Sequence, residues 1–153
     1  MKAFIAVCAL LTFVVVPAYA QSIPNYAGTW ALDKAKSKGV REGLDIKLEI
    51  KQDTQRITLK TTYDDGAGPL SIFERAFELN GAKTKAERYG NDLTLYVEKK
   101  SDGNFVFHTE YKHPDADPFT SLETLTLSGG GKSLEYKDIR GKKQIQYFFN
   151  KRG

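Results

Sequence analysis

The sequence has few residues that could stabilise the fold covalently, because only one of its 153 residues is a cysteine. That residue, Cys8, lies in the first apolar run, so residues 21–153 contain no cysteine and form no disulfide. Packing and backbone hydrogen bonds must therefore hold the fold together. A domain of about 130 residues can achieve this, since it buries roughly two thirds of the surface that its unfolded chain exposes. We expect a single domain over residues 21–153.

No apolar run in the sequence is long enough for a typical membrane-spanning helix. The longest run covers residues 3–16, whereas a spanning helix needs about 20 apolar residues. It follows Lys2 and precedes Ala18-Tyr19-Ala20, an arrangement typical of a secretory signal peptide. We therefore expect residues 1–20 to be removed as a signal peptide. The mature protein should then be secreted or periplasmic, without stable insertion in a membrane.

Charge of neither sign dominates the chain. There are 23 basic and 19 acidic residues, interspersed along the sequence, and the formal net charge is +4. Small basic groups such as Lys142-Lys143 fall at expected turns and chain ends. A nucleic-acid-binding protein would gather its basic residues into a patch or stripe, so the pattern argues against a nucleic-acid partner.

Residues suited to catalysis or metal binding are scarce. His108 and His113 are the only histidines, and no serine lies in the Gly-x-Ser-x-Gly pattern of hydrolases. His113 is followed by Asp115 and Asp117, but two prolines in the same stretch are typical of a polar loop, and the spacing does not fit a common metal site. We expect no enzymatic activity, no cofactor and no metal site.

The sequence does contain a regular alternation of apolar and polar residues, which is typical of half-buried β-strands. Turn sequences such as Asn80-Gly81, a strong hairpin signal, separate the alternating runs. No sustained helical period is present. The pattern predicts about ten strands, at residues 29–32, 46–51, 57–60, 70–79, 83–89, 93–99, 104–112, 122–127, 133–139 and 144–150.

Strands joined by tight hairpins form an antiparallel meander with two unpaired edges. Curling the sheet until its first and last strands approach each other protects these edges and buries one apolar face. The sequence therefore predicts an all-β, up-and-down barrel of about 8–10 strands with little helix. A sandwich would need long crossing connections. The longest links are residues 33–44 and 113–120, so one irregular crossing stays open.

The only tryptophan, Trp30, lies in Gly28-Thr29-Trp30 at the start of the first strand, and the last strand ends with Lys151-Arg152. With these features the chain resembles the calycin superfamily of lipocalins and fatty-acid-binding proteins, and in particular small secreted lipocalin-like proteins of bacteria. The resemblance implies that the indole closes one end of the barrel under a basic side chain of the last strand. Arg152 is the first candidate and Lys151 the second. A cation over an aromatic ring contributes about 0.5 to 2 kcal/mol.

Two features depart from the families that the chain resembles. Residues 62–65 read Thr-Tyr-Asp-Asp, which does not match the Thr-Asp-Tyr loop motif of lipocalins. Fatty-acid-binding proteins insert two helices after the first strand, whereas the link at residues 33–44 has room for one helical turn or a short lid.

If the chain forms a barrel, alternate residues line its interior and could contact a ligand. Phe73, Arg75 and Phe77 share one strand face, so Arg75 would need a partner there, such as an anionic head group. Alternatively, a bulge turns this stretch or Arg75 faces water. The remaining candidate lining residues are aromatic: Phe105, Phe107, Tyr136 and Tyr147.

Three functions fit the sequence. The first is a non-catalytic barrel that binds a small hydrophobic or amphipathic ligand. The second is a filled barrel that acts as a protein-interaction or inhibitor module of the cell envelope through loops such as residues 113–120. An interior cavity of about 300 Å³ or more would favour the first over the second. The third, an enzyme acting on a lipid or cell-wall component, would need a polar cluster near His108.

Overall fold

The alternating residues form ten strands in the structure, a computed structural model that describes residues 23–153. The expected signal peptide, residues 1–20, lies outside the described residues. The strands are β1 (Gly28–Leu32), β2 (Asp45–Gln52), β3 (Arg56–Asp64), β4 (Pro69–Glu78), β5 (Thr84–Arg88), β6 (Asn91–Lys99), β7 (Phe105–His113), β8 (Ala116–Ser128), β9 (Ser133–Arg140) and β10 (Lys143–Arg152). The single short 3-10 turn of the described chain, η1 (Gly129–Gly131), joins β8 to β9.

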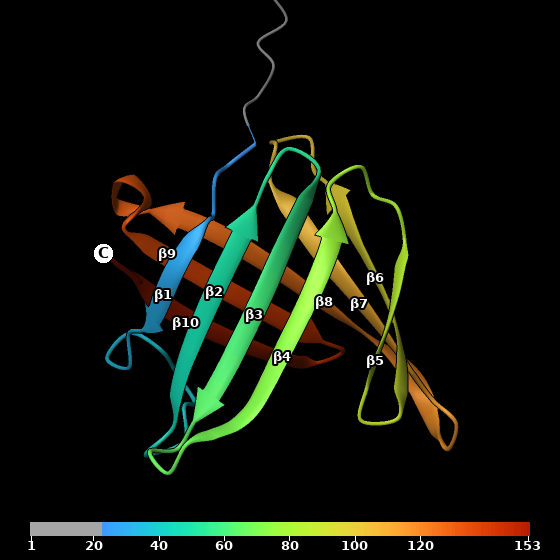
Figure 1. The fold of residues 1–153 in the computed structure, drawn as a ribbon, viewed down its shortest axis with the longest axis horizontal. Helices are drawn as coiled ribbons and strands as arrows, with labels where there is room; N and C mark the ends of the chain where they lie inside the picture. Colours follow the sequence, from blue (N-terminus) through green and yellow to red (C-terminus); the bar gives the residue numbers. More distant parts are fainter. Residues whose placement is uncertain (1–22) are drawn as a thin grey trace, which may run out of the picture.

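All ten strands belong to one antiparallel sheet, in the order β4-β3-β2-β1-β10-β9-β8-β7-β6-β5 (Figure 1). Strand β1 pairs with both β2 and β10, so the first and last strands are neighbours. The sheet curls into a nearly closed barrel, with β1–β4 in front of β8–β10 in Figure 1. The predicted all-β, up-and-down barrel is therefore confirmed.

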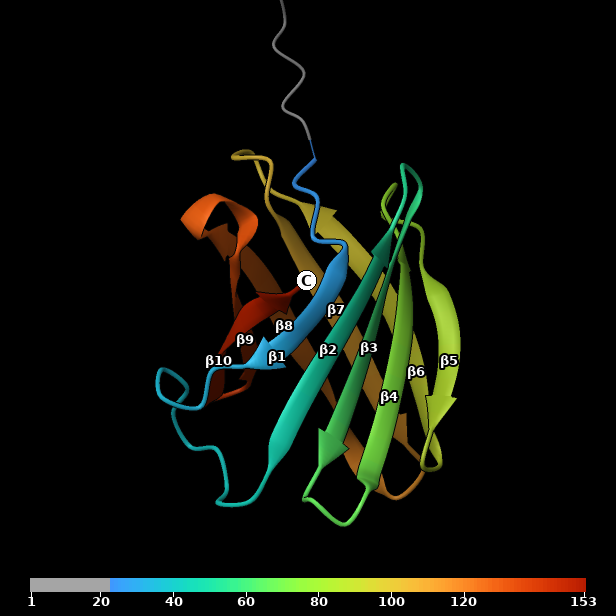
Figure 2. The same ribbon diagram turned by 60° about the vertical axis from the view of Figure 1, so that its left-hand side comes forward.

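No backbone ladder joins β4 to β5, although they follow each other in the chain. We call the region between them the β4–β5 seam. Figure 2 shows β4, β6 and β5 near one another on the right-hand side of the barrel. The barrel therefore keeps two unpaired strand edges, which face each other along the seam.

Neither of the two longest predicted links, residues 33–44 and 113–120, is a crossing connection. Residues 33–44 form turns without a helix, as the short spacing predicts. The prediction of a loop over residues 113–120 is wrong, because β7 reaches His113 and β8 begins at Ala116. The ladder accommodates the polar, proline-containing stretch with a register shift between Tyr111 and His113.

The barrel interior is the hydrophobic core. Cross-strand pairs such as Leu48 with Thr61 and Ile50 with Leu59 place their side chains on the same inner face. Buried residues come from nine of the ten strands, and the segment before β1 adds Tyr26. The strand alternation predicted from the sequence therefore positions one layer of side chains inside and one outside.

The segment before β1 closes one end of the barrel, which we call the Trp30 end. Trp30 is fully buried, and its indole Nε1 donates a hydrogen bond to the Tyr26 carbonyl oxygen at 3.0 Å. The Tyr26 hydroxyl donates in turn to the Leu125 carbonyl oxygen of β8 at 3.2 Å. Gln52 holds the same segment by donating its amide to the Pro24 carbonyl oxygen at 2.9 Å. Trp30 thus links β1 to the chain crossing this end.

The basic side chain over the indole is that of Lys151. Its Nζ lies 5.3 Å from the indole centroid, and the sheet register pairs it with Trp30. Arg152, the first candidate, instead pairs with Thr29 on the opposite face of the strand. Gly28 has a φ of +147°, a backbone conformation that residues with a side chain rarely adopt, and its missing Cβ leaves room for Lys151 Cε.

We expect Trp30→Ala to lower the free energy of unfolding by about 3 to 5 kcal/mol, because it leaves a cavity and removes the bond to Tyr26. Urea unfolding followed by circular dichroism measures this. Ile72→Thr is the control: Ile72 is 53% exposed on the outer face of β4, so its replacement should change stability by less than about 1 kcal/mol. A Trp30→Ala protein as stable as the control would contradict the closing role.

Candidate functional site

The structure brings all seven predicted lining residues to the inner face of the barrel. Phe77 and Phe107 meet edge to face with ring centroids 5.1 Å apart. Tyr136 and Tyr147 stack at 6.3 Å and pack against the core. Contact of these residues with a ligand stays a prediction. The seven residues are Phe73, Arg75, Phe77, Phe105, Phe107, Tyr136 and Tyr147.

An ion pair crosses the interior. Arg75 of β4 donates from Nη1 to Glu123 Oε1 of β8, and both side chains are almost fully buried. Because β4 and β8 are not neighbours in the sheet, the pair spans the space enclosed by the barrel. The alternatives in which Arg75 faces water or lies in a bulge are therefore wrong. The partner that Arg75 requires is a carboxylate of the same chain.

The ion pair continues into a chain of polar contacts. Ser121 donates its hydroxyl proton to Asp138 Oδ1 and lies 3.5 Å from Glu123 Oε1. Arg140 contacts Asp138 Oδ2 through Nε at 2.9 Å and Nη2 at 2.6 Å. We call these five residues, Arg75, Glu123, Ser121, Asp138 and Arg140, the polar chain. Its two cations and two carboxylates carry no net charge when all four are ionised.

Three buried polar atoms next to the Arg75–Glu123 contact have no hydrogen-bond partner within residues 23–153: Arg75 Nε, Glu123 Oε2 and Thr109 Oγ1. The exposed fractions of these residues are 4%, 1% and 0%. Thr109 pairs with Ser121 in the β7–β8 register, which places it beside the polar chain. An unpaired buried polar group costs about 1 to 3 kcal/mol, so such groups ordinarily bind water or a ligand.

Four tyrosines around the polar chain have raised pKa values: Tyr63, Tyr111, Tyr136 and Tyr147. Burial is the largest cause for each. The pKa of Tyr136 lies well above its usual value, since the charge of Glu123 adds to its burial. Burial lowers the pKa of Arg75, but Glu123 more than offsets this and holds it above its usual value. The interior therefore keeps its phenols neutral and its arginine charged.

The side chains leave little free volume at the centre of the barrel. A cavity of about 10 Å³ lies among residues of β2, β3, β9 and β10. That volume is at the lower limit for one water molecule, which needs roughly 10 to 15 Å³. Its lining residues are Ile46, Leu48, Thr61, Tyr63, Tyr136, Tyr147 and Phe149. The interior enclosed by residues 23–153 therefore lacks the cavity of about 300 Å³ that would favour ligand binding over a filled barrel.

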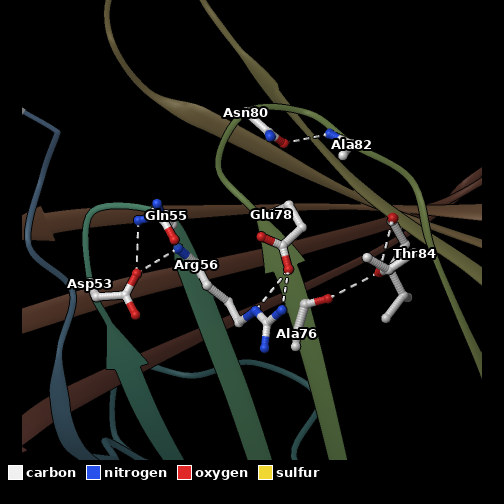
Figure 3. A network of polar contacts seen from close by, with 9 residues as sticks. Asp53, Gln55, Arg56, Ala76, Glu78, Asn80, Ala82 and Thr84 are labelled. Carbon is white, nitrogen blue, oxygen red and sulfur yellow. Dashed lines mark hydrogen bonds and ion pairs between the residues drawn. The ribbon is translucent and has the colours of Figure 1, made fainter.

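An open groove of about 340 Å³ lies along the β4–β5 seam at the surface of the barrel, and Arg75 is among its lining residues. We call this groove the seam cavity. Apolar Leu95 and two alanines line it beside charged residues of the two strand edges. At its Trp30 end, Thr84 Oγ1 lies 3.3 Å from the Ala76 carbonyl oxygen (Figure 3). The full lining is Arg56, Glu74, Arg75, Ala76, Glu78, Thr84, Lys85, Ala86 and Leu95.

Side chains close the other end of the seam. The guanidinium of Arg88 on β5 lies 3.8 Å from the ring centroid of Phe73 on β4, and that of Arg75 lies 4.5 Å from the same ring. Arg88 also donates from Nη2 to Ser71 Oγ at 2.8 Å, and the Tyr89 hydroxyl lies 3.2 Å from the same oxygen. Contacts between side chains, rather than a backbone ladder, therefore join β5 to β4 here.

A second hollow, of about 510 Å³, lies on the outer face of β5–β8. Its charged residues are of both signs, with Lys85 and Lys112 near Asp92 and Glu110. These outward positions alternate with the buried residues Leu93 and Leu95 on β6. We call this hollow the outer groove.

His108 lies on the outer face of β7, away from the polar chain. Its ring stacks on Tyr96 with centroids 4.4 Å apart, and its Nε2 lies 3.3 Å from Glu98 Oε2. The polar cluster that an enzyme would need near His108 is therefore not found in the described interior. Within residues 23–153, no group of three metal-ligating side chains is gathered, and no helix is long and apolar enough to cross a membrane.

The carboxylates of the polar chain were not predicted from the sequence. Glu123 lies between Leu122 and Thr124, so the alternation does not show which face of β8 is buried. Ser121 lies inside β8 but just before the strand predicted at residues 122–127, and Asp138 lies near the end of the strand predicted at residues 133–139. The available signal was Arg75 itself, because a cation on an inward face requires an inward carboxylate on another strand.

We expect Glu123→Ala to lower the free energy of unfolding by about 3 to 5 kcal/mol, because it leaves Arg75 charged and buried. The double variant Arg75→Met/Glu123→Leu should recover most of this loss. Urea unfolding of the single and double variants measures it. For the exposed Lys83–Glu110 pair, the matched Glu110→Ala change should cost at most about 1 kcal/mol. Equal losses in the two single variants would contradict the buried pair.

The raised tyrosine pKa values predict that stability falls as the pH rises above about 10, the pKa of an unfolded tyrosine. Below that value both states hold the phenolic proton. Above it, only the unfolded state releases the proton readily, which favours unfolding. Urea unfolding between pH 8 and 11 should show a weaker fall in Tyr136→Phe than in the unmodified protein. Tyr89→Phe is the control, since the pKa of exposed Tyr89 is lowered by Ser71; identical pH profiles for all three proteins would refute the prediction.

No protein-family model matches the chain. Lipid-binding protein 8 of Caenorhabditis elegans is similar in structure, with 18% identity, coverage of 83% of this chain and 95% of that chain, and a TM-score of 0.61. A fatty-acid-binding protein of Schistosoma mansoni in complex with arachidonic acid gives 14% identity, coverage of 86% and 99%, and a TM-score of 0.60. Secretory abundant heat soluble protein 4 of Ramazzottius varieornatus has 14% identity, coverage of 84% of this chain and 95% of that chain, and a TM-score of 0.58. The chain therefore has the ten-stranded, calycin-like barrel fold of the fatty-acid-binding proteins.

Proposed function

We propose that this protein is a non-catalytic carrier of a small hydrophobic or amphipathic molecule, which it binds through the β4–β5 seam. One observation carries the proposal. Buried polar atoms of Arg75, Glu123 and Thr109 lack partners within the described residues, and Arg75 also lines the 340 Å³ seam cavity at the surface. Small-molecule sites commonly have volumes of about 300 to 1,000 Å³, with apolar walls and a few placed polar groups.

The solved structures support ligand binding by analogy. The C. elegans protein is named as a lipid-binding protein, and the S. mansoni protein contains arachidonic acid. The R. varieornatus protein has a similar fold and is named for heat solubility. Since one fold serves more than one role, the proposal rests on the seam and the unpaired atoms rather than on the fold.

The predicted lining residues would contribute at two depths. Arg75 lines the seam cavity, so a ligand would meet it first, and Phe73 packs beside Arg75. Phe77 contacts Phe107 deeper in the core. A ligand that extends past the seam would therefore have to displace aromatic side chains. Phe105, Tyr136 and Tyr147 would be the innermost residues that it could contact.

We further propose that the protein acts after export, in the secreted or periplasmic setting expected from residues 1–20. Residues 21–153 contain no cysteine, so the protein would fold in that setting without a disulfide. The likeness to small secreted lipocalin-like proteins of bacteria belongs to this proposal.

A second candidate function is a filled barrel that binds another protein. The 10 Å³ central cavity and the larger outer groove favour it. Pro118, Phe119 and Thr120 line that groove, and they belong to the segment expected to form an interaction loop. The two candidates therefore differ in the surface they use, seam or outer groove.

Displacement of the fluorescent probe Nile red should distinguish the two surfaces. We expect the protein to bind the probe and Ala86→Phe, which fills the seam, to weaken binding at least tenfold. Thr120→Phe fills the outer groove instead and should leave the affinity unchanged, since Thr120 does not line the seam cavity. Native mass spectrometry of protein purified from its own host should reveal a bound small molecule. A protein that binds no probe and carries no molecule would overturn the proposal.

A further inference from the structure

We infer that the seam site selects an uncharged polar head group, such as a hydroxyl or a primary amide, over a free carboxylate. This inference rests on the proposed function and names the chemical class of the ligand. Three features of the Arg75 environment lead to it: its charge balance, its unpaired hydrogen-bonding atoms and its burial.

The charge balance leaves no cation at this depth for an anionic ligand. Arg75 is paired with Glu123, and Arg140 is paired with Asp138. A carboxylate that approached Arg75 would meet the negative charge of Glu123 at nearly the same distance. The attraction and the repulsion would largely cancel, whereas the cost of removing the carboxylate from water would remain.

The unpaired atoms suit a neutral group better. Arg75 Nε is a donor, Glu123 Oε2 is an acceptor, and the Thr109 hydroxyl can act as either. Of these three residues only Arg75 lines the seam cavity, and Glu123 is reached through its contact with Arg75. A ligand hydroxyl or amide that enters beside Arg75 has both a donor and an acceptor, so it can satisfy Glu123 and Arg75 together. An ionised carboxylate accepts only, and it would leave Glu123 Oε2 without a donor.

Burial also disfavours a negatively charged ligand group. The surrounding phenols of Tyr63, Tyr111 and Tyr136 have raised pKa values, chiefly because burial disfavours their charged forms. An acidic ligand group in the same surroundings would experience the same penalty. The interior therefore opposes new negative charge even where Arg75 is close.

Two cations near the seam have no carboxylate partner among the described residues and are competing anchors for an anion: Lys85, which lines the exposed rim of the seam cavity, and Arg88. Arg88 stacks on Phe73 and donates to Ser71, and it does not line the seam cavity. Arg75 does line that cavity, which is why the inference follows Arg75. An anion held by Arg88 is a distinct outcome of the test below.

The decisive experiment compares three ligands of equal chain length on the unmodified protein: dodecan-1-ol, dodecanamide and dodecanoate at pH 8. Each is titrated against bound Nile red. We expect the alcohol and the amide to bind at least tenfold more tightly than the acid, about 1.4 kcal/mol. Tighter or equal binding of the acid overturns the inference. If no ligand displaces the probe, the proposed function fails instead, so the two failures are distinguishable.

Glu123→Gln tests the cause of the preference. The change keeps an acceptor of similar shape but leaves the charge of Arg75 unbalanced. We expect the ratio of alcohol to acid affinity to shift at least tenfold toward the acid. Glu110→Gln, which alters an exposed pair with Lys83, should leave the ratio unchanged.

Arg88→Gln completes the set. An acid preference in the unmodified protein that disappears in Arg88→Gln would assign the head group to Arg88 and overturn the inference. If Glu123→Gln does not fold, the ligand ranking on the unmodified protein still decides the question.

Discussion

The ion pair between Arg75 and Glu123 constrains the barrel more than any other polar contact. It joins two strands that are not neighbours in the sheet, so it fixes the distance between opposite walls. Neither charge can be buried alone without a cost of several kcal/mol, and each therefore depends on the other being in place. Ser121, Asp138 and Arg140 extend the same dependence to β9. The interior is consequently both well packed and polar at its centre.

The seam follows from the topology of the sheet. Ten strands in the order from β4 to β5 leave these two strands without a ladder between them, and side chains take over its role. Phe73 and Arg88 join the strands at one end, and Thr84 approaches the Ala76 carbonyl at the other. The cavity between these contacts is where the polar centre of the barrel comes nearest to the surface. The proposed ligand site and its selectivity thus arise from one gap in the backbone pairing.

Most of the fold could be predicted because it depends on local signals. Period-2 alternation and turn sequences such as Asn80-Gly81 identify strands without knowledge of their partners. The burial of Trp30 and the inward placement of Phe77 and Phe107 follow from the same alternation. The prediction of a loop over residues 113–120 was wrong. Prolines and aspartates are typical of loops, but pairing with β7 holds most of this segment in β8.

The site was less predictable because its contacts join distant parts of the chain. Arg75 and Glu123 are 48 positions apart in the sequence, and no pattern in the intervening chain links the two positions. The choice between Lys151 and Arg152 depends on one residue of register between β1 and β10, which a sequence does not display. Charge pairing inside a barrel is therefore a property of the closed sheet, and only the need for a partner is visible in advance.

The two unpaired strand edges of the seam are relevant to self-association of the protein. Unpaired strands are templates for strand exchange between molecules, and natural proteins protect them with charge or by covering them. Here each edge shields the other, and Glu74, Glu78 and Lys85 place charge along the opening. Conditions that separated β5 from β4 would expose both templates at once, and the contact between Arg88 and Phe73 opposes that separation.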